Sequence, residues 1–313
     1  MSDSRHRNRI SLLLRFLLAI ALLVATVRFA ASDFANVSAT LAQAACWPIV
    51  AVVFLFLLTR LTDALYMSAL YRPAAPTLTF RGSLRLVIIQ GVAALAIPRF
   101  GNIAGAAWLK TSHGLGILKF SGIHIAATLI NAGLIAVLGF MAAWFVPQPQ
   151  REPIALAILL CAFATVVLSL ALISRQKIAR GSRWRDALAD AHEGFSSISS
   201  RPARLPAILL LQGWSMLART ARIGFSILAI SAVWPNSAGL VEAGAIADLA
   251  TLVALTPAGL GLREAAATAT ANVAGVTAEI MLAGVLLDRM IGIAGTLLLG
   301  IPLLWSSSHE KAD

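Results

Sequence analysis

Two stretches decide the fold: Ala96-Ile97-Pro98-Arg99-Phe100-Gly101-Asn102 and Thr256-Pro257-Ala258-Gly259-Leu260-Gly261-Leu262-Arg263-Glu264. Each places proline, glycine and charge in the middle of a hydrophobic segment, where an uninterrupted membrane helix tolerates none of them. The two stretches lie at comparable depths in the two halves of the chain. Paired interruptions of this kind indicate a transport-type site where two structural repeats meet. The residues that break the segments are Pro98, Gly101, Pro257, Gly259 and Gly261.

The composition is typical of a protein built largely of membrane-spanning helices. The 313 residues are 59% hydrophobic and 12% charged, and the mean hydropathy is +0.84, which excludes a large soluble domain. The longest polar segment, 175–204, is too short to house a catalytic domain. The sequence contains no phosphate-binding loop, dinucleotide fingerprint or metal-spaced His/Cys cluster. We therefore expect a protein that is not an enzyme and that binds no cofactor or metal ion.

The lengths of the apolar runs predict an all-α polytopic membrane protein that forms a single domain over 1–313. A span needs about 20 apolar residues. Two apolar regions, 83–116 and 241–276, carry the breaks described above. About six full transmembrane helices are expected, near 10–30, 43–62, 119–146, 152–174, 205–232 and 279–304.

The basic residues predict which loops face the cytoplasm. They gather before the first helix, in 60–85 and in 175–204, whereas 31–42 and 233–240 contain no Lys or Arg. Positive-inside bias therefore places the N-terminus, these two basic segments and the C-terminus in the cytoplasm of a bacterial inner membrane. The net charge of +11 is spread over loops, which favours anionic lipid headgroups over nucleic acid as the partner.

The same charge count predicts how the broken regions cross the membrane. If both 83–116 and 119–146 crossed fully, the basic segment 175–204 would lie outside. We therefore expect 83–116 and 241–276 to be re-entrant hairpins whose tips meet inside the bundle, since irregular backbone cannot face lipid. Each half, 1–150 and 151–313, then crosses an odd number of times, which predicts an inverted repeat. The alternative is two full helices kinked at proline.

One soluble-type amphipathic helix is expected in the cytoplasmic basic loop 175–204. Its apolar residues recur every three or four positions. The helix would lie either on the inner leaflet or as a cap on neighbouring helices. The recurring residues are Trp184, Leu188, Ala191, Phe195 and Ile198.

Ionisable residues inside apolar runs are the candidate functional groups, because charge in a membrane is costly. Guanidinium groups match phosphate geometry, and the free N–H groups of a broken helix also favour an anion. The alternative is that the charges pair only to hold helices together. Arg15 and Glu242 lie near helix ends and are set aside as snorkelling residues. The predicted substrate-binding set is Arg99, Arg219, Arg222, Arg263, Glu264, Asp288 and Arg289, with Asp248 as a further titratable group.

Both broken stretches resemble signatures of the lysylphosphatidylglycerol synthase transmembrane-region family, also called flippase-like. The stretch 256–264 is similar to the signature Ser/Thr-Pro-x-Gly-x-Gly-x-Arg-Glu, and Asp288-Arg289 fits a charged position in the last helix. Pro98-Arg99-Phe100-Gly101-Asn102 resembles the first signature, although Asn102 stands where the family usually has Glu. The resemblance covers roughly 10–305, and because the sequence ends at Asp313 we expect a stand-alone member that lacks the synthase domain.

The resemblance implies a role in membrane-lipid handling. In bifunctional members this region moves an aminoacylated lipid that a cytosolic domain makes, and stand-alone relatives are associated with hopanoid or polyprenyl-linked glycolipid pathways. Our first hypothesis is a flippase that moves an anionic or polyprenyl-linked lipid headgroup between leaflets. The alternative is a non-catalytic membrane subunit that presents a lipid to a separate lipid-modifying transferase.

The predicted topology can be tested by labelling single engineered cysteines with a membrane-impermeant reagent, in a background that lacks Cys46 and Cys161. We expect labelling from outside at Arg151 and Asn236, and labelling only from the cytoplasm at Arg81 and Arg180. Labelling of position 180 from outside would overturn the inverted arrangement.

Overall fold

The computed structural model describes residues 45–96, 100–147, 153–174, 183–199, 202–253 and 261–309, and the described residues contain no strand. The all-α fold is therefore confirmed. The predicted helix 10–30 lies outside the described residues, as do Pro98, Arg99, Pro257 and Gly259. The described helices are α2 (Cys46–Tyr71), α3 (Phe80–Ala96), α4 (Phe100–His113), α5 (Ile117–Ala143), α6 (Pro153–Ser174), α7 (Arg183–Ser199), α8 (Leu205–Ser231), α9 (Ser237–Val253), α10 (Leu262–Ala269) and α11 (Ala278–His309). Two short 3-10 turns, Pro202–Arg204 and Ala271–Ala274, lie between helices.

Several helices have the length and composition of membrane spans. Among the described residues, three candidates are long and apolar enough to cross a bilayer: α2, α5 and the part of α11 over Ala278–Gly300. Large apolar side chains such as Phe54, Ile125 and Leu298 are exposed on their surfaces, as expected where lipid replaces water. α6 and α8 lie at predicted positions too, and α8 is as long as α5. The chain is thus a polytopic membrane protein.

Both broken segments fold as helical hairpins. Helix α3 packs against α4, and α9 packs against α10, whereas two halves of one kinked helix would lie end to end. Gly101 and Gly105 of α4 both face Gln90 of α3, where an added Cβ would collide with Gln90. Small residues thus allow the two helices to approach closely. The side of the membrane from which each hairpin enters stays a prediction.

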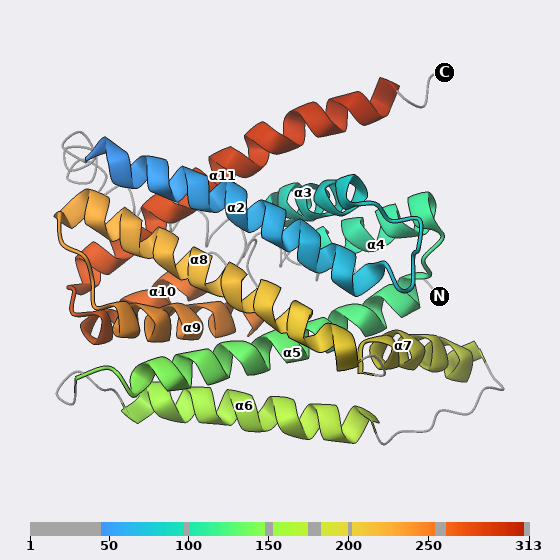
Figure 1. The fold of residues 1–313 in the computed structure, drawn as a ribbon, viewed down its shortest axis with the longest axis horizontal. Helices are drawn as coiled ribbons and strands as arrows, with labels where there is room; N and C mark the ends of the chain where they lie inside the picture. The colour runs from blue at the N-terminus through green and yellow to red at the C-terminus, as the bar shows by residue number, and fades with distance from the viewer. Residues whose placement is uncertain are drawn as a thin grey trace, which may run out of the picture.

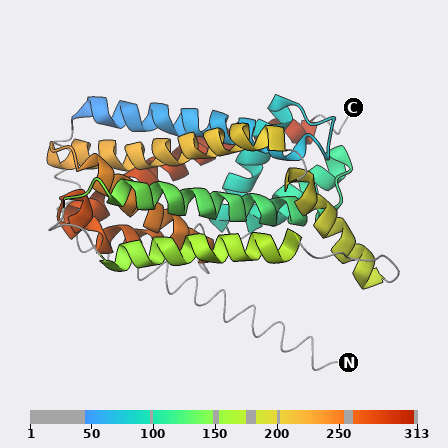
Figure 2. The same ribbon diagram turned by 60° about the horizontal axis from the view of Figure 1, so that its bottom comes forward.

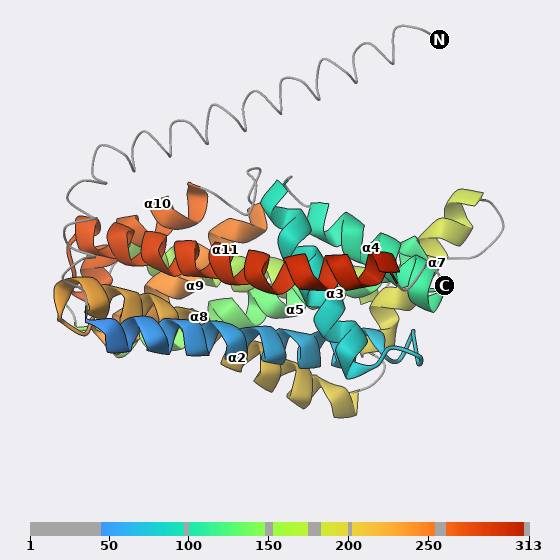
Figure 3. The same cartoon turned by 90° about the horizontal axis from the view of Figure 1, so that it is seen from above.

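The helices repeat an order of helix, hairpin and helix. In the first half these are α2, α3–α4 and α5, and in the second α8, α9–α10 and α11. The packing is reciprocal, because α3 packs on α11 while α9 packs on α5, and α2 packs on α8. Figure 1 shows that α2 and α8 run in opposite directions, as do α5 and α11. The hairpins lie at opposite ends of the long axis (Figures 1 and 3), as an inverted repeat requires.

Helix α7 lies at one end of the bundle (Figure 2) and packs on the start of α5. The contact is close enough that an added Cβ at Gly122 would meet the Ala191 backbone, and one at Gly194 would meet the Lys119 backbone. Lys119 Nζ binds Glu193 Oε1 at 2.8 Å. Of the two predicted positions for this amphipathic helix, the packing favours the cap on neighbouring helices.

The first described span is longer than the sequence predicts. The expected end was residue 62, and Arg60 was assigned to a cytoplasmic loop, whereas α2 continues to Tyr71. The assignment of Arg60 is wrong. Its spacing from Asp63 and Tyr66 is helical, so these polar side chains form one stripe that faces the bundle interior. Hydropathy alone therefore ends this helix too early.

The docking of α7 predicts a specific effect of Gly194→Ala. The new Cβ would press on the backbone oxygen of Lys119, and overpacking of this kind costs about 1–3 kcal/mol. Gly213→Ala is the matched control, because its Cβ would meet only Leu side chains at 3.8 Å and beyond. Thermal unfolding of the purified proteins should show a lower midpoint for Gly194→Ala than for the unmodified protein, and no decrease for the control. Equal midpoints would contradict the docking.

Candidate functional site

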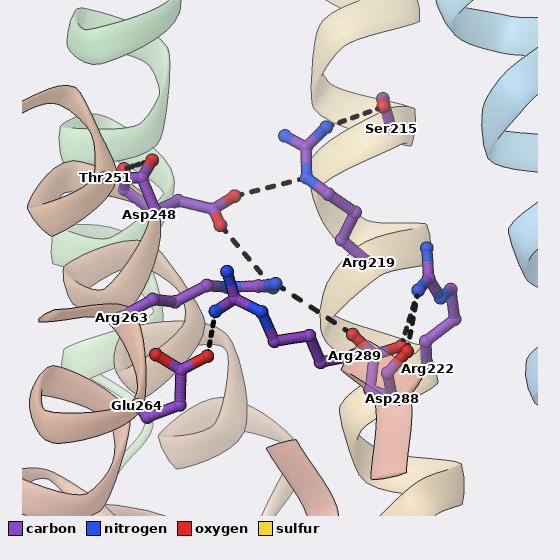
Figure 4. A network of polar contacts seen from close by, with 9 residues as sticks. All are labelled: Ser215, Arg219, Arg222, Asp248, Thr251, Arg263, Glu264, Asp288 and Arg289. Atoms are coloured by element: carbon purple, nitrogen blue, oxygen red, sulfur yellow. Dashed lines mark hydrogen bonds and ion pairs between the residues drawn. The ribbon is translucent and has the colours of Figure 1, made fainter. Parts of the chain in front are cut away.

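Seven charged residues from α8, α9, α10 and α11 converge in one network (Figure 4): Arg219, Arg222, Asp248, Arg263, Glu264, Asp288 and Arg289. Its most buried pair joins α8 to α11, where Arg222 Nη2 lies 2.7 Å from Asp288 Oδ1 and the side chains are 7% and 2% exposed. Arg222 also lies over the Phe56 ring at 5.3 Å, a cation–π distance. This pair is closed to solvent and fixes α8 against α11.

Longer contacts extend the network from this pair to α9 and α10. Arg263 Nη1 lies 3.9 Å from Asp288 Oδ2, and Arg263 Nη2 lies 3.7 Å from Asp248 Oδ1. Asp248 Oδ2 in turn accepts a hydrogen bond from Arg219 Nε at 3.3 Å. Cations and anions therefore alternate from Arg222 to Arg219, and three of these contacts are loose.

Glu264 has two partners. It binds Arg289 of α11, and its Oε2 accepts a hydrogen bond at 2.8 Å from the N–H of Gly261, the residue before α10. Gly261 has a φ of +87°, a conformation that glycine adopts without the Cβ penalty. We expected N–H groups at this break to bind an anionic ligand, but here the protein's own carboxylate takes the Gly261 N–H.

Charged residues that are adjacent in the sequence form ion pairs with residues of another helix. Arg263-Glu264 on α10 faces Asp288-Arg289 on α11, so Arg263 meets Asp288 and Glu264 meets Arg289. All the predicted site residues that the structure describes belong to this set of contacts, and Arg99 lies outside the described residues. The geometry shows that the charges hold α10 to α11, as the structural alternative expects, and leaves their role toward a ligand as a proposal.

A cavity of about 390 Å³ adjoins the network. Its wall is partly apolar, and we call it the polar cavity for the charged, amide and hydroxyl side chains that it contains. Residues of α2, α3, α4, α5 and α8 line it, including Gly101 and Asn102 of the first hairpin. Arg219 belongs to both features: it lines the cavity, and its Nη1 donates to Ser215 Oγ at 2.9 Å. Ser215 Oγ donates to Asp63 Oδ1 at 2.8 Å, which continues the polar contacts to α2.

Several polar residues in the bundle were missed by the sequence analysis. Glu242 was set aside as a snorkelling residue, and this is wrong, because its side chain is fully buried. Its position near the start of α9 hid this, since α9 itself is packed inside the bundle. On α8 the available signal was the spacing of Gln212, Ser215, Arg219 and Arg222, which places all of them along one face.

Ser121 and His124 lie one turn apart on α5, a spacing at which a hydroxyl nucleophile and a base could pair, but the structure gives each another partner. The Ser121 hydroxyl donates to the carbonyl of Ile117 at 2.9 Å within its own helix, and the His124 ring stacks on Phe120 with centroids 5.8 Å apart. Within the described residues no group of three or more His, Cys, Asp and Glu side chains could hold a metal ion.

Comparison with known proteins gives one family. The family model described as the lysylphosphatidylglycerol synthase TM region matches residues 12–300 of the chain. The curated proteins give no match.

The burial of the Arg222–Asp288 pair predicts a large effect of removing one partner. Asp288→Ala should lower the unfolding free energy by about 3–5 kcal/mol, because it strands a buried guanidinium. The double variant Arg222→Met/Asp288→Leu should recover most of this loss. The exposed pair of Lys119 and Glu193, 32% and 52% exposed, is the control, and Glu193→Ala should cost at most about 1 kcal/mol. Chemical unfolding in detergent measures the unfolding free energy of the three variants and of the unmodified protein. An unfolding free energy of Asp288→Ala equal to that of the unmodified protein would contradict the structural role of the pair.

Proposed function

The chain belongs to the lysylphosphatidylglycerol synthase TM region family, a membrane family connected with lipid handling, and we propose that it moves a lipid with an anionic headgroup between the leaflets of a membrane. The observation that carries this proposal is the position of Arg219, which is shared by the charge network and the polar cavity. A bilayer of the bacterial plasma membrane, with both termini in the cytoplasm, fits the charge distribution of the loops.

The charged interior would lower the free-energy barrier to moving a charged headgroup across the membrane. Moving an anionic headgroup through hydrocarbon is costly because its charge loses solvation. Arginine side chains inside the bundle replace water around a phosphate and match its oxygens with paired N–H groups. The sequence contains no ATP-binding motif, so movement in this proposal runs down a gradient or is coupled to ions.

The distances support a sequence of events within the network. The contacts of Arg219 and Arg263 with Asp248 measure 3.3 and 3.7 Å, whereas Arg222 and Asp288 are held at 2.7 Å. A phosphate that enters the cavity competes with Asp248 for Arg219. Loss of this contact weakens the link between α8 and α9, and the second hairpin is then free to move against α8. The Arg222–Asp288 pair stays closed as the fixed part of the site.

The proposal is tested by reconstituting the purified protein alone into liposomes and measuring how fast a labelled anionic lipid changes leaflet. Movement by the protein alone supports a flippase. The competing hypothesis, a subunit that presents lipid to a separate transferase, requires no movement. Folded protein that moves none of a panel of anionic lipids would contradict the proposed function.

We expect Arg219→Lys to reduce the rate of lipid movement at least tenfold, because lysine keeps the charge and loses the planar fork that contacts two oxygens. Lys119→Gln is the control, since it removes a cation whose ion pair joins α5 to α7 and which belongs neither to the cavity lining nor to the charge network. Unfolding midpoints of both variants show whether a loss of rate reflects a loss of fold. Unchanged transport by folded Arg219→Lys would rule out the proposed role of the guanidinium.

A further inference from the structure

The wall of the polar cavity carries several neutral hydrogen-bonding groups. Seven of its described side chains are uncharged amides, imidazole and hydroxyl groups that both donate and accept or can be oriented to do so. They come from α2, from both arms of the first hairpin and from α5 and α8. These side chains are Tyr66, Gln90, Asn102, His124, Thr128, Asn131 and Gln212.

The charged part of the same wall is net positive. Arg60 and Arg219 contribute two cations, and Asp63 is the carboxylate that lines the cavity. Asp63 is already engaged, because it accepts from Ser215 at 2.8 Å and lies 3.7 Å from Arg60. This carboxylate thus shares its charge with Arg60 and Ser215, and the two guanidinium groups leave the wall net positive, which disfavours a ligand ammonium group. Arg219 lines the cavity; its Nε and Nη1 bind Asp248 and Ser215, and its Nη2 has no hydrogen-bond partner among the described residues.

Two buried donors in this wall point to a ligand that accepts hydrogen bonds. Gln90 Nε2 and Arg60 Nε are shielded from solvent and donate to no acceptor within the described part of the chain. An unmet buried donor is costly. Because Gln90 and Arg60 both line the cavity, a rotation of their side chains toward an anionic oxygen in the cavity would satisfy both a charge and a hydrogen-bonding requirement.

The amides of α5 and α8 supply the other half of the recognition. Gln212 Nε2 donates to Asn131 Oδ1 at 2.6 Å, which orients both groups and leaves an acceptor, Gln212 Oε1, beside a donor, Asn131 Nδ2. A donor and an acceptor side by side match a hydroxyl group, which donates and accepts at once. A phosphate without hydroxyl groups would leave this amide pair unused.

Building on the proposed function, we propose that this cavity selects phosphate-ester headgroups that carry hydroxyl groups, and rejects headgroups that carry an ammonium group. Arg60, Arg219 and Gln90 bind the phosphate oxygens, and the Asn131–Gln212 pair binds the hydroxyls. The volume of about 390 Å³ falls in the range of about 300–1,000 Å³ that is usual for small-molecule sites.

The test measures lipid binding to the purified protein in nanodiscs of phosphatidylcholine that contain one added lipid. The probes are phosphatidylglycerol, with hydroxyls and a phosphate; phosphatidic acid, with a phosphate and no polyol; and lysylphosphatidylglycerol, with added ammonium groups. We expect the first to bind about tenfold more tightly than the second, as two additional hydrogen bonds allow, and the third to bind most weakly. Equal affinities, or tightest binding of the lysylated lipid, would overturn the inference.

Variants assign the discrimination to named residues. Asn131→Leu/Gln212→Leu should reduce binding of phosphatidylglycerol about tenfold, to the level of phosphatidic acid, and leave phosphatidic acid unchanged. Gln90→Leu, which weakens binding of both lipids in the proposal, provides a second variant if the double variant does not fold. Asn272→Leu, at an exposed amide, is the control. Full discrimination by the folded double variant would overturn the assignment.

Two further arms separate this inference from the proposed function and from a soluble ligand. Selective binding without leaflet exchange would contradict the flippase and support the cavity assignment. Exchange of all anionic lipids at one rate, with equal affinities, would support the flippase and overturn the selectivity. Free glycerol 1-phosphate should compete only weakly with phosphatidylglycerol, and binding as tight as that of the lipid would overturn a lipid headgroup as the ligand.

Discussion

A charge inside a membrane bundle is stable only beside an opposite charge, and this constraint organises the interior of the protein. Arg222 and Asp288, nearly closed to solvent, meet at 2.7 Å between α8 and α11. Arg263 and Glu264 of α10 then find their partners on α11 and α9. Each helix that contributes a charge contacts the helix that carries its partner, so the position of the second hairpin depends on these ion pairs as well as on apolar packing.

The two hairpins occupy equivalent places in an inverted arrangement and carry different chemistry. The first, α3–α4, is held together by glycines around Gln90 and supplies neutral hydrogen-bonding groups to the cavity. The second, α9–α10, supplies Asp248, Arg263 and Glu264 to the charge network. Helix α8 lies between these features, and Arg219 is the side chain that contacts both. In the proposed function, a ligand in the cavity acts on the second hairpin through Arg219, without touching that hairpin itself.

Hydropathy and helix-breaking residues predicted much of this fold, because spans and hairpins depend on local composition. The described helices after α2 begin and end close to the predicted positions, and the charges inside apolar runs identified the network on α8, α10 and α11. The partners of these charges could not be predicted, since they depend on which helices pack together. Arg263 and Glu264 are adjacent in the sequence, yet Arg263 contacts Asp288 and Glu264 contacts Arg289. Neutral amides such as Asn131 and Gln212 scarcely alter hydropathy, so these residues of the cavity wall were missed, whereas Arg219 was predicted. Glu242 was misjudged because distance from a helix end does not report burial.

The central claim is that an anionic headgroup takes Arg219 from Asp248 and thereby frees the second hairpin from α8. The most direct measurement is the distance distribution between spin labels at Leu217 of α8 and Leu262 of α10, both exposed, in protein with the exposed Cys46 and Cys161 replaced. In nanodiscs of neutral lipid, the account predicts a single distance between the two labels. Once anionic lipid is added, it predicts a second population of molecules with a different distance. Arg219→Gln should populate the second distance without that lipid. A single distribution, unchanged by anionic lipid and by Arg219→Gln, would contradict the account.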